Sequence, residues 1–172
     1  MSDMFVFAFK NETGAHDMLA EVGQLQKQQL ITISDAATVV RHQDGKVKVK
    51  QANSLVGAGA LGGAFWGMLI GLLFFAPWLG LVVGAVAGAI GGKLSDYGID
   101  DEFIKNVGAT IQPGDSALFL LVEKVTADKV IPALEKYHPT VLQTSLTADA
   151  EAKLRAAFGA DEAPAETAAE AA

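Results

Sequence analysis

Residues 51–92 read QANSLVGAGALGGAFWGMLIGLLFFAPWLGLVVGAVAGAIGG and contain no charged side chain. Soluble domains rarely leave so long a stretch uncharged. Glycines recur along it at every fourth position. They form two ladders, the first made of Gly59, Gly63, Gly67 and Gly71, and the second, after Pro77, of Gly80, Gly84, Gly88 and Gly92. This stretch divides the chain into a part before it and a part after it.

The spacing of these glycines is typical of helix packing rather than of catalysis. Residues four apart lie one above the other on an α-helix, so each ladder lines a groove against which another helix can approach closely. Such faces of small residues drive helix association in lipid, where burial of apolar surface alone gives no net gain. The ladders therefore predict two packed helices, with Pro77 and Trp78 in the turn between them.

The lengths of the two halves favour a membrane hairpin. Leu55–Phe75 would give about 31 Å of helix, close to the ~30 Å hydrocarbon core of a bilayer. Leu79–Gly92 would reach only about 21 Å and would depend on its partner. Lysines flank the run and none lies in its central turn, which places both termini on the cytoplasmic side of an inner membrane. A re-entrant hairpin and a hairpin buried in a soluble oligomer remain open as alternatives.

Composition excludes several function classes. The net charge of −7 lies entirely C-terminal to the apolar run, and this acidic half argues against nucleic acid as a partner, because phosphate binding needs clustered Lys and Arg. Cysteine is absent, so disulfides, thiolate metal sites and cysteine nucleophiles are excluded. The first apolar patch, Phe5–Phe9, is too short for a secretory signal peptide. Its side chains alternate in the way that is typical of a β-strand.

On both sides of residues 51–92, the spacing of the hydrophobic residues is typical of an α+β domain. Strands are expected at Met4–Lys10, Ile31–His42, Lys46–Lys50, Ser116–Glu123 and Thr140–Leu146. Helices are expected at Ala15–Leu30 with Thr13 as N-cap, after the acids Asp100, Asp101 and Glu102, at Ala127–Tyr137, and at Thr147–Phe158. Asp44-Gly45 between two strands predicts a hairpin, and the continuous apolar run of Ser116–Glu123 predicts a central strand.

Without residues 51–92, the order of elements predicts a ferredoxin-like antiparallel sheet with right-handed crossovers. The expected organisation is therefore a discontinuous α+β domain over residues 1–50 and 93–158, interrupted by the inserted glycine-zipper hairpin at 51–92. Residues 159–172 carry Ala, Glu, Pro and Thr without apolar periodicity and predict a disordered acidic tail.

No catalytic, cofactor or metal-binding constellation is recognisable. His16, His42 and His138 lie on three different expected elements and are interpreted as surface or edge residues. The acids at 96–102 lack the alternating spacing of a calcium loop and are better explained as helix capping. Gly57 and Gly59 lack the setting of a nucleotide-binding loop. We therefore expect a protein that is not an enzyme, with no cofactor and no identified small-molecule substrate.

Three motifs together resemble one known family. Asp35–Arg41 with Asp44–Val47 resembles its N-terminal hairpin, the paired glycine ladders resemble its central hairpin, and Tyr97–Ile104 with Pro113–Phe119 resembles its C-terminal signature. The chain is thus similar to the bacterial and archaeal glycine-zipper proteins of domain of unknown function 1269. The resemblance implies a membrane protein linked to stress responses, with no established activity and no catalytic residues to carry over.

These observations lead to two function hypotheses. The first is a non-enzymatic protein whose glycine-zipper hairpin inserts into the bilayer of the inner membrane and packs into homo-oligomers. The second is a soluble oligomeric scaffold or ligand-binding protein whose hairpins form a shared buried core.

Overall fold

The computed structural model describes residues 2–52, 63–74 and 99–146. Within these ranges the chain forms five strands and four helices. In chain order they are β1 (Ser2–Phe9), α1 (Gly14–Lys27), β2 (Ile31–Arg41), β3 (Val47–Gln51), α2 (Gly63–Phe74), α4 (Asp101–Thr110), β4 (Ser116–Val125), α5 (Ala127–Glu135) and β5 (Thr140–Leu146). The α+β class is confirmed.

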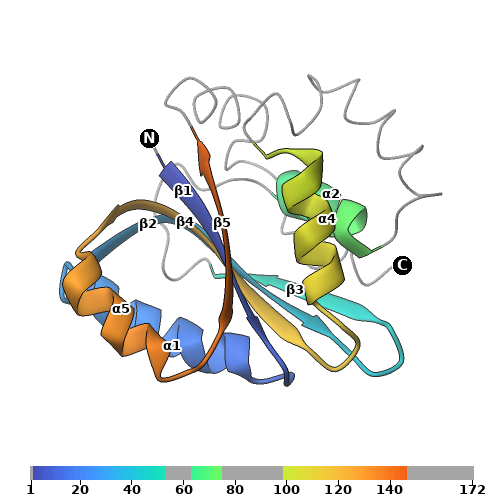
Figure 1. Ribbon diagram of the computed structural model, residues 1–172, viewed down its shortest axis with the longest axis horizontal. Coiled ribbons are helices and arrows are strands. Elements are labelled where there is room, and N and C mark those ends of the chain that lie inside the picture. Colours follow the sequence, from blue (N-terminus) through green and yellow to red (C-terminus); the bar gives the residue numbers. More distant parts are fainter. Residues whose placement is uncertain (1, 53–62, 75–98, 147–172) are drawn as a thin grey trace.

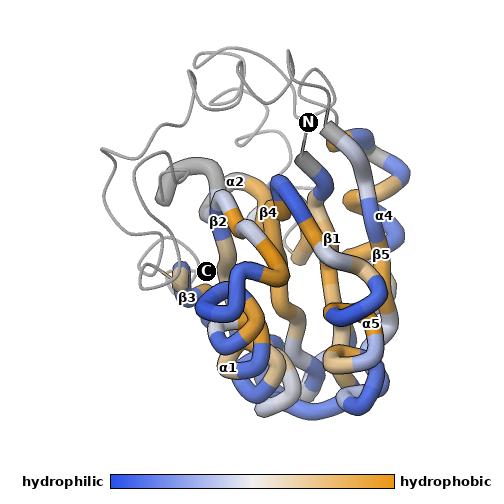
Figure 2. Tube along the Cα trace, turned by 90° about the vertical axis from the view of Figure 1, so that its left-hand side faces the viewer, coloured by the Kyte–Doolittle hydropathy of each residue, from blue (hydrophilic) through white to orange (hydrophobic). Residues whose placement is uncertain are grey.

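The strands form one antiparallel sheet in the order β3-β2-β4-β1-β5. β4 lies at its centre, as its continuous apolar run predicted, and Figure 2 shows β4 as hydrophobic along most of its length. Successive side chains of a strand point to opposite faces. A strand with both faces covered is therefore apolar at every position, and residues 117–122 of β4 are buried.

Helices cover both faces of the sheet (Figure 1). α1 and α5 lie on one face, where Leu118 and Leu120 of β4 join their core cluster. α2 and α4 lie on the other face, where Phe119 and Leu121 join a second cluster. The molecule therefore has three layers, with two separate hydrophobic cores on either side of one sheet.

Two of the expected local signals are confirmed in full, and the third is confirmed in its position only. Gly45 adopts a positive φ of 87° in the β2–β3 hairpin, and Asp100 accepts a 2.7 Å hydrogen bond from the backbone N–H of Phe103 at the start of α4. Thr13 lies at the N-cap position of α1, as expected, but its side chain makes no capping hydrogen bond. Asn11 accepts from the backbone N–H groups of Thr13 and Gly14 instead.

Residues 63–74, a described part of the apolar run, pack onto the sheet. α2 spans these 12 residues, and they lie within the helix that the sequence predicted over Leu55–Phe75. Trp66, Leu69 and Ile70 of α2 are fully or almost fully buried against the strands and α4. These three apolar side chains, which the sequence assigned to lipid, therefore form part of a protein core.

In the described ranges, no helix combines the length and the apolar character needed to cross a membrane. This finding contradicts the predicted transmembrane helices. It likewise contradicts the predicted inner-membrane location with both termini in the cytoplasm. The physical reason is the burial of Trp66, Leu69 and Ile70 of α2 in the core beside the sheet.

The glycine ladders fall only in part within the structure. Gly63, Gly67 and Gly71 lie on α2. Gly59, Gly80, Gly84, Gly88, Gly92, Pro77 and Trp78 lie outside the described residues, as do the predicted final helix and the acidic tail. The division into an α+β domain, an inserted hairpin and a tail stays a prediction.

Candidate functional site

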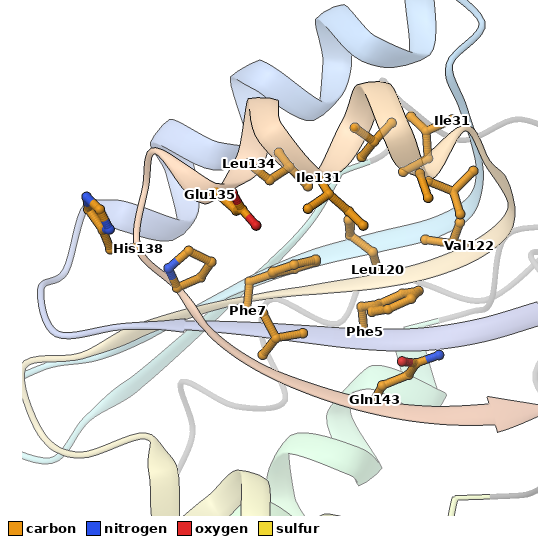
Figure 3. Close-up of a pocket in the computed structure, with 15 residues that line it drawn as sticks. Phe5, Phe7, Ile31, Leu120, Val122, Ile131, Leu134, Glu135, His138 and Gln143 are labelled. Atoms are coloured by element: carbon orange, nitrogen blue, oxygen red, sulfur yellow. The ribbon is translucent and has the colours of Figure 1, made fainter.

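An apolar groove lies between α5 and the sheet. It has a volume of about 780 Å³, within the range of ~300–1,000 Å³ that is usual for small-molecule sites. α5 packs beside α1 (Figure 1), and residues of α5, β1 and β5 line the groove between them (Figure 3). The groove therefore lies in the layer of α1 and α5, on the face of the sheet opposite to α2.

Two phenylalanines form the floor of the groove. Phe5 and Phe7 project from the same face of β1, because residues two apart on a strand share a face. Their ring centroids are 6.0 Å apart and their planes are inclined by only 17°. Figure 3 shows both rings beneath α5, with Ile131 and Leu134 extending from the helix toward them. The floor is thus a flat aromatic platform that faces aliphatic side chains.

The groove also gathers exposed apolar surface. Val125, Ile131 and Val141 are the large hydrophobic side chains that stay exposed in the described part of the chain, at 43%, 53% and 52%. All three line the groove. Single exposed hydrophobic residues are ordinary, whereas several that converge on one concave surface indicate a binding site.

Few polar groups border the groove. Glu135 comes from the last residue of α5, His138 from the turn that follows, and Gln143 from β5. His138 adopts φ 51°, a left-handed conformation that histidine tolerates better than most residues, and so ends the helical path before β5. The groove thus offers a ligand one carboxylate, one imidazole and one amide.

A polar cluster fixes α5 against α1 on the outer side of this layer. Glu21 of α1 accepts a 3.1 Å hydrogen bond from Lys136 and a 3.2 Å bond from the Tyr137 hydroxyl. The bond to Glu21 raises the pKa of Lys136 above its ordinary value. Partial burial raises the pKa of Tyr137, and its bond to Glu21 adds to the shift. The cluster holds the helix that forms the roof of the groove.

A second polar cluster lies in the core beneath α2. Asp35 is fully buried, and its carboxylate accepts hydrogen bonds from the indole Nε1 of Trp66 at 3.1 Å and from Nε2 of Gln51 at 3.3 Å. The indole also lies against Phe119, with ring centroids 6.0 Å apart. These contacts join α2 to β2, β3 and β4, and we interpret the cluster as structural.

The residues that the sequence singled out do not build the groove. Gly63, Gly67 and Gly71 lie on α2, in the opposite layer. The tight helix contact in that layer involves Gly108 of α4, where a Cβ atom would lie 2.7 Å from the carbonyl oxygen of Leu73. Of the three histidines, only His138 lines the groove. His16 is exposed, and His42 lies 2.8 Å from the Glu12 carboxylate.

Sequence reasoning missed the groove because its residues are ordinary in sequence. The alternation of Phe5, Phe7 and Phe9 was recognised only as a strand signal. The remaining signal was the exposed position of Ile131, which follows directly after Val130 on a short helix containing Pro132. Whether Ile131 is exposed depends on how α5 packs against the sheet, which its local sequence does not determine.

The comparisons with known proteins give one family. A family model described as "Protein of unknown function (DUF1269)" matches residues 60–159, more than half of the chain. Neither the curated proteins nor the solved structures include a match to the chain.

Proposed function

The chain belongs to the DUF1269 family of proteins of unknown function, and within that family we propose that it is a non-enzymatic binding protein for small apolar molecules. The ligand occupies the groove between α5 and the sheet. The observation that carries this proposal is the convergence of Val125, Ile131 and Val141, all exposed, on one concave surface of about 780 Å³.

The chemistry of the lining defines the ligand class. The parallel rings of Phe5 and Phe7 present a flat surface on which an aromatic or otherwise planar molecule can stack. Among the described lining residues, Glu135 carries a formal negative charge, and the whole chain carries −7. Both features disfavour an anion. We therefore assign the groove to planar, apolar molecules without negative charge.

The fold supports a binding role of this kind. Two strand–helix–strand units, β1-α1-β2 and β4-α5-β5, give the strand order β2-β4-β1-β5, with β3 added outside β2. This order supports the ferredoxin-like arrangement, in which both crossover helices share one face of the sheet. The groove results from the position of the second crossover helix beside the first.

A ligand panel tests the proposal. The full chain is titrated with Nile red, which is neutral and planar, with an aliphatic amine, and with a fatty acid of similar apolar area. Binding that is saturable and tightest for Nile red supports the assignment. Preferential binding of the fatty acid would refute the assigned charge class, and absence of saturable binding for all three probes would refute the binding function itself.

A further inference from the structure

The negative charge of the groove lies at one end of it. Glu135, the last residue of α5, supplies a carboxylate to the lining. Among the residues that the structure describes, no side chain bonds to this carboxylate, and the neighbouring Lys136 donates to Glu21 of α1 instead. Figure 3 shows the ring of His138 turned outward, away from Phe7. The Glu135 carboxylate is therefore available to a ligand in the groove.

The end of α5 adds to this negative charge. The peptide dipoles of an α-helix leave a partial negative charge at its C-terminus, and the last turn of α5 contains no basic side chain that would offset it. The turn after the helix leads directly into β5, where Val141 pairs with Phe7 and Gln143 pairs with Phe5. The negative end of α5 therefore lies at the Phe7 end of the aromatic platform (Figure 3).

The aromatic platform attracts positive charge as well. The quadrupole of an aromatic ring makes its face negative, so a cation within about 6 Å of the ring centroid is attracted to it. The planes of Phe5 and Phe7 are inclined by only 17° to each other, and both rings lie beneath α5. Two different features of the groove, a carboxylate and the faces of two rings, thus favour the same charge in a ligand.

We propose that the preferred ligand of the groove is a planar organic cation whose positive charge lies at the Glu135 end. Its apolar part extends toward Ile31 and Val122, at the other end of the groove (Figure 3). The inference rests on the proposed binding function and narrows its ligand class to cations. A metal ion fits less well, because the described residues contain no group of three or more His, Asp or Glu side chains that could hold one.

Nile red and Nile blue form a matched pair of probes for this charge. They share one planar ring system, but Nile red is neutral and Nile blue is a cation at neutral pH. At low ionic strength, we expect the full native chain to bind Nile blue about three- to tenfold more tightly than Nile red. This preference should decrease as salt is added, because Glu135 is exposed and salt screens its charge.

Glu135→Gln tests the assigned cause of the preference, since it removes the charge and keeps the size of the side chain. We expect the ratio of the two dissociation constants to fall at least about twofold in this variant. Asp128→Asn makes the same charge change in the first turn of α5, at an exposed residue outside the lining, and should leave the ratio unchanged.

The outcomes separate this inference from the binding function on which it rests. Equal affinity of the native chain for both dyes would overturn the cation preference and leave the binding function intact. An equal change of the ratio in Glu135→Gln and Asp128→Asn would overturn the inference too, because it would assign the preference to the net charge of the chain. If neither dye binds saturably, the binding function itself fails, and the inference fails with it.

Discussion

The indole Nε1 of Trp66 donates a 3.1 Å hydrogen bond to the carboxylate of Asp35, and both residues are fully buried. A β-bulge makes this contact possible. Ile33 packs in the core with α1, and without a register shift Asp35 would face the same way. The shift between Ile33 and Asp35 turns Asp35 to the α2 side of the sheet.

This contact predicts a measurable coupling between α2 and β2. Trp66→Phe removes the donor and should lower the free energy of unfolding by about 1–3 kcal/mol, because the buried carboxylate loses a partner. Urea denaturation followed by circular dichroism measures the loss. In a double-mutant cycle with Asp35→Ala, which removes the acceptor, we expect a coupling energy of at least about 0.5 kcal/mol. Additive effects would show that the hydrogen bond does not hold α2 in place.

Gly108 predicts the effect of a single added methyl group. A Cβ atom there would lie 2.7 Å from the backbone oxygen of Leu73, so Gly108→Ala must push α4 away from α2. Overpacking of this kind costs about 1–3 kcal/mol, and the better helix propensity of alanine returns at most about 1 kcal/mol. We expect a net loss of about 1 kcal/mol in thermal or urea unfolding. Asn106→Ala, an exposed position in the same helix, should be neutral or stabilising. If Gly108→Ala were as stable toward unfolding as the native chain, the close contact between α4 and α2 would be contradicted.

The start of α1 predicts an unequal effect of two neighbouring substitutions. Asn11 accepts from the backbone N–H groups of Thr13 and Gly14, whereas Thr13 makes no capping bond. Asn11→Ala should therefore cost about 0.5–2 kcal/mol, and Thr13→Ala should cost clearly less. Parallel urea titrations compare the two. A larger loss in Thr13→Ala would restore the capping role that the sequence predicted.

Glu21 predicts a dependence of stability on alkaline pH. The raised pKa values of Lys136 and Tyr137 mean that the folded chain retains protons which the unfolded chain releases. Their contribution is fully present below the ordinary values of 10.5 and 10.0, and it is lost as the pH rises through the raised values. Glu21→Gln should therefore lower the melting temperature at neutral pH, with a difference from the native chain that shrinks at strongly alkaline pH.

Glu12→Gln provides the control for this experiment. It makes the same charge change at an exposed residue that contacts His42 rather than Lys136 or Tyr137. Its difference from the native chain should not vary between neutral and strongly alkaline pH. A Glu21→Gln profile that runs parallel to the native one over this range would contradict the assigned cause of the shifts.

Much of the sheet could be predicted from local sequence patterns. Alternation predicted β1 and β3, the continuous apolar run of β4 predicted its central position, and Asp44-Gly45 predicted the hairpin. Each of these signals is contained in a few consecutive residues, because it depends on the alternation within one strand or on the residues of one turn. The same holds for Asp100 at the start of α4.

The remaining features depend on contacts between distant residues. Asp35 and Trp66 are 31 positions apart, and only the bulge in β2 brings them together. The run that contains Trp66 has the composition of a membrane helix, and composition alone does not distinguish burial in lipid from burial against a sheet. The groove likewise depends on the position of α5 beside α1, to which the local sequence of α5 gives no direct signal.

The proposed binding function depends on the groove, and a substitution at Ile131 tests it most directly. This side chain is 53% exposed and lines the groove, so a charge there need not disturb the core. Ile131→Glu places a carboxylate in the proposed apolar site. Lys129→Glu introduces the same side chain on the same helix outside the lining. Circular dichroism verifies that both variants are folded.

The decisive measurement is the dissociation constant of Nile red for the native chain and these two variants, determined by fluorescence titration. We predict saturable binding to the native chain, a loss of about tenfold or more in Ile131→Glu, because an apolar ligand would have to desolvate the new carboxylate, and a change of less than about twofold in Lys129→Glu. Equal affinity of the native chain and Ile131→Glu would contradict the assignment of the groove as the binding site.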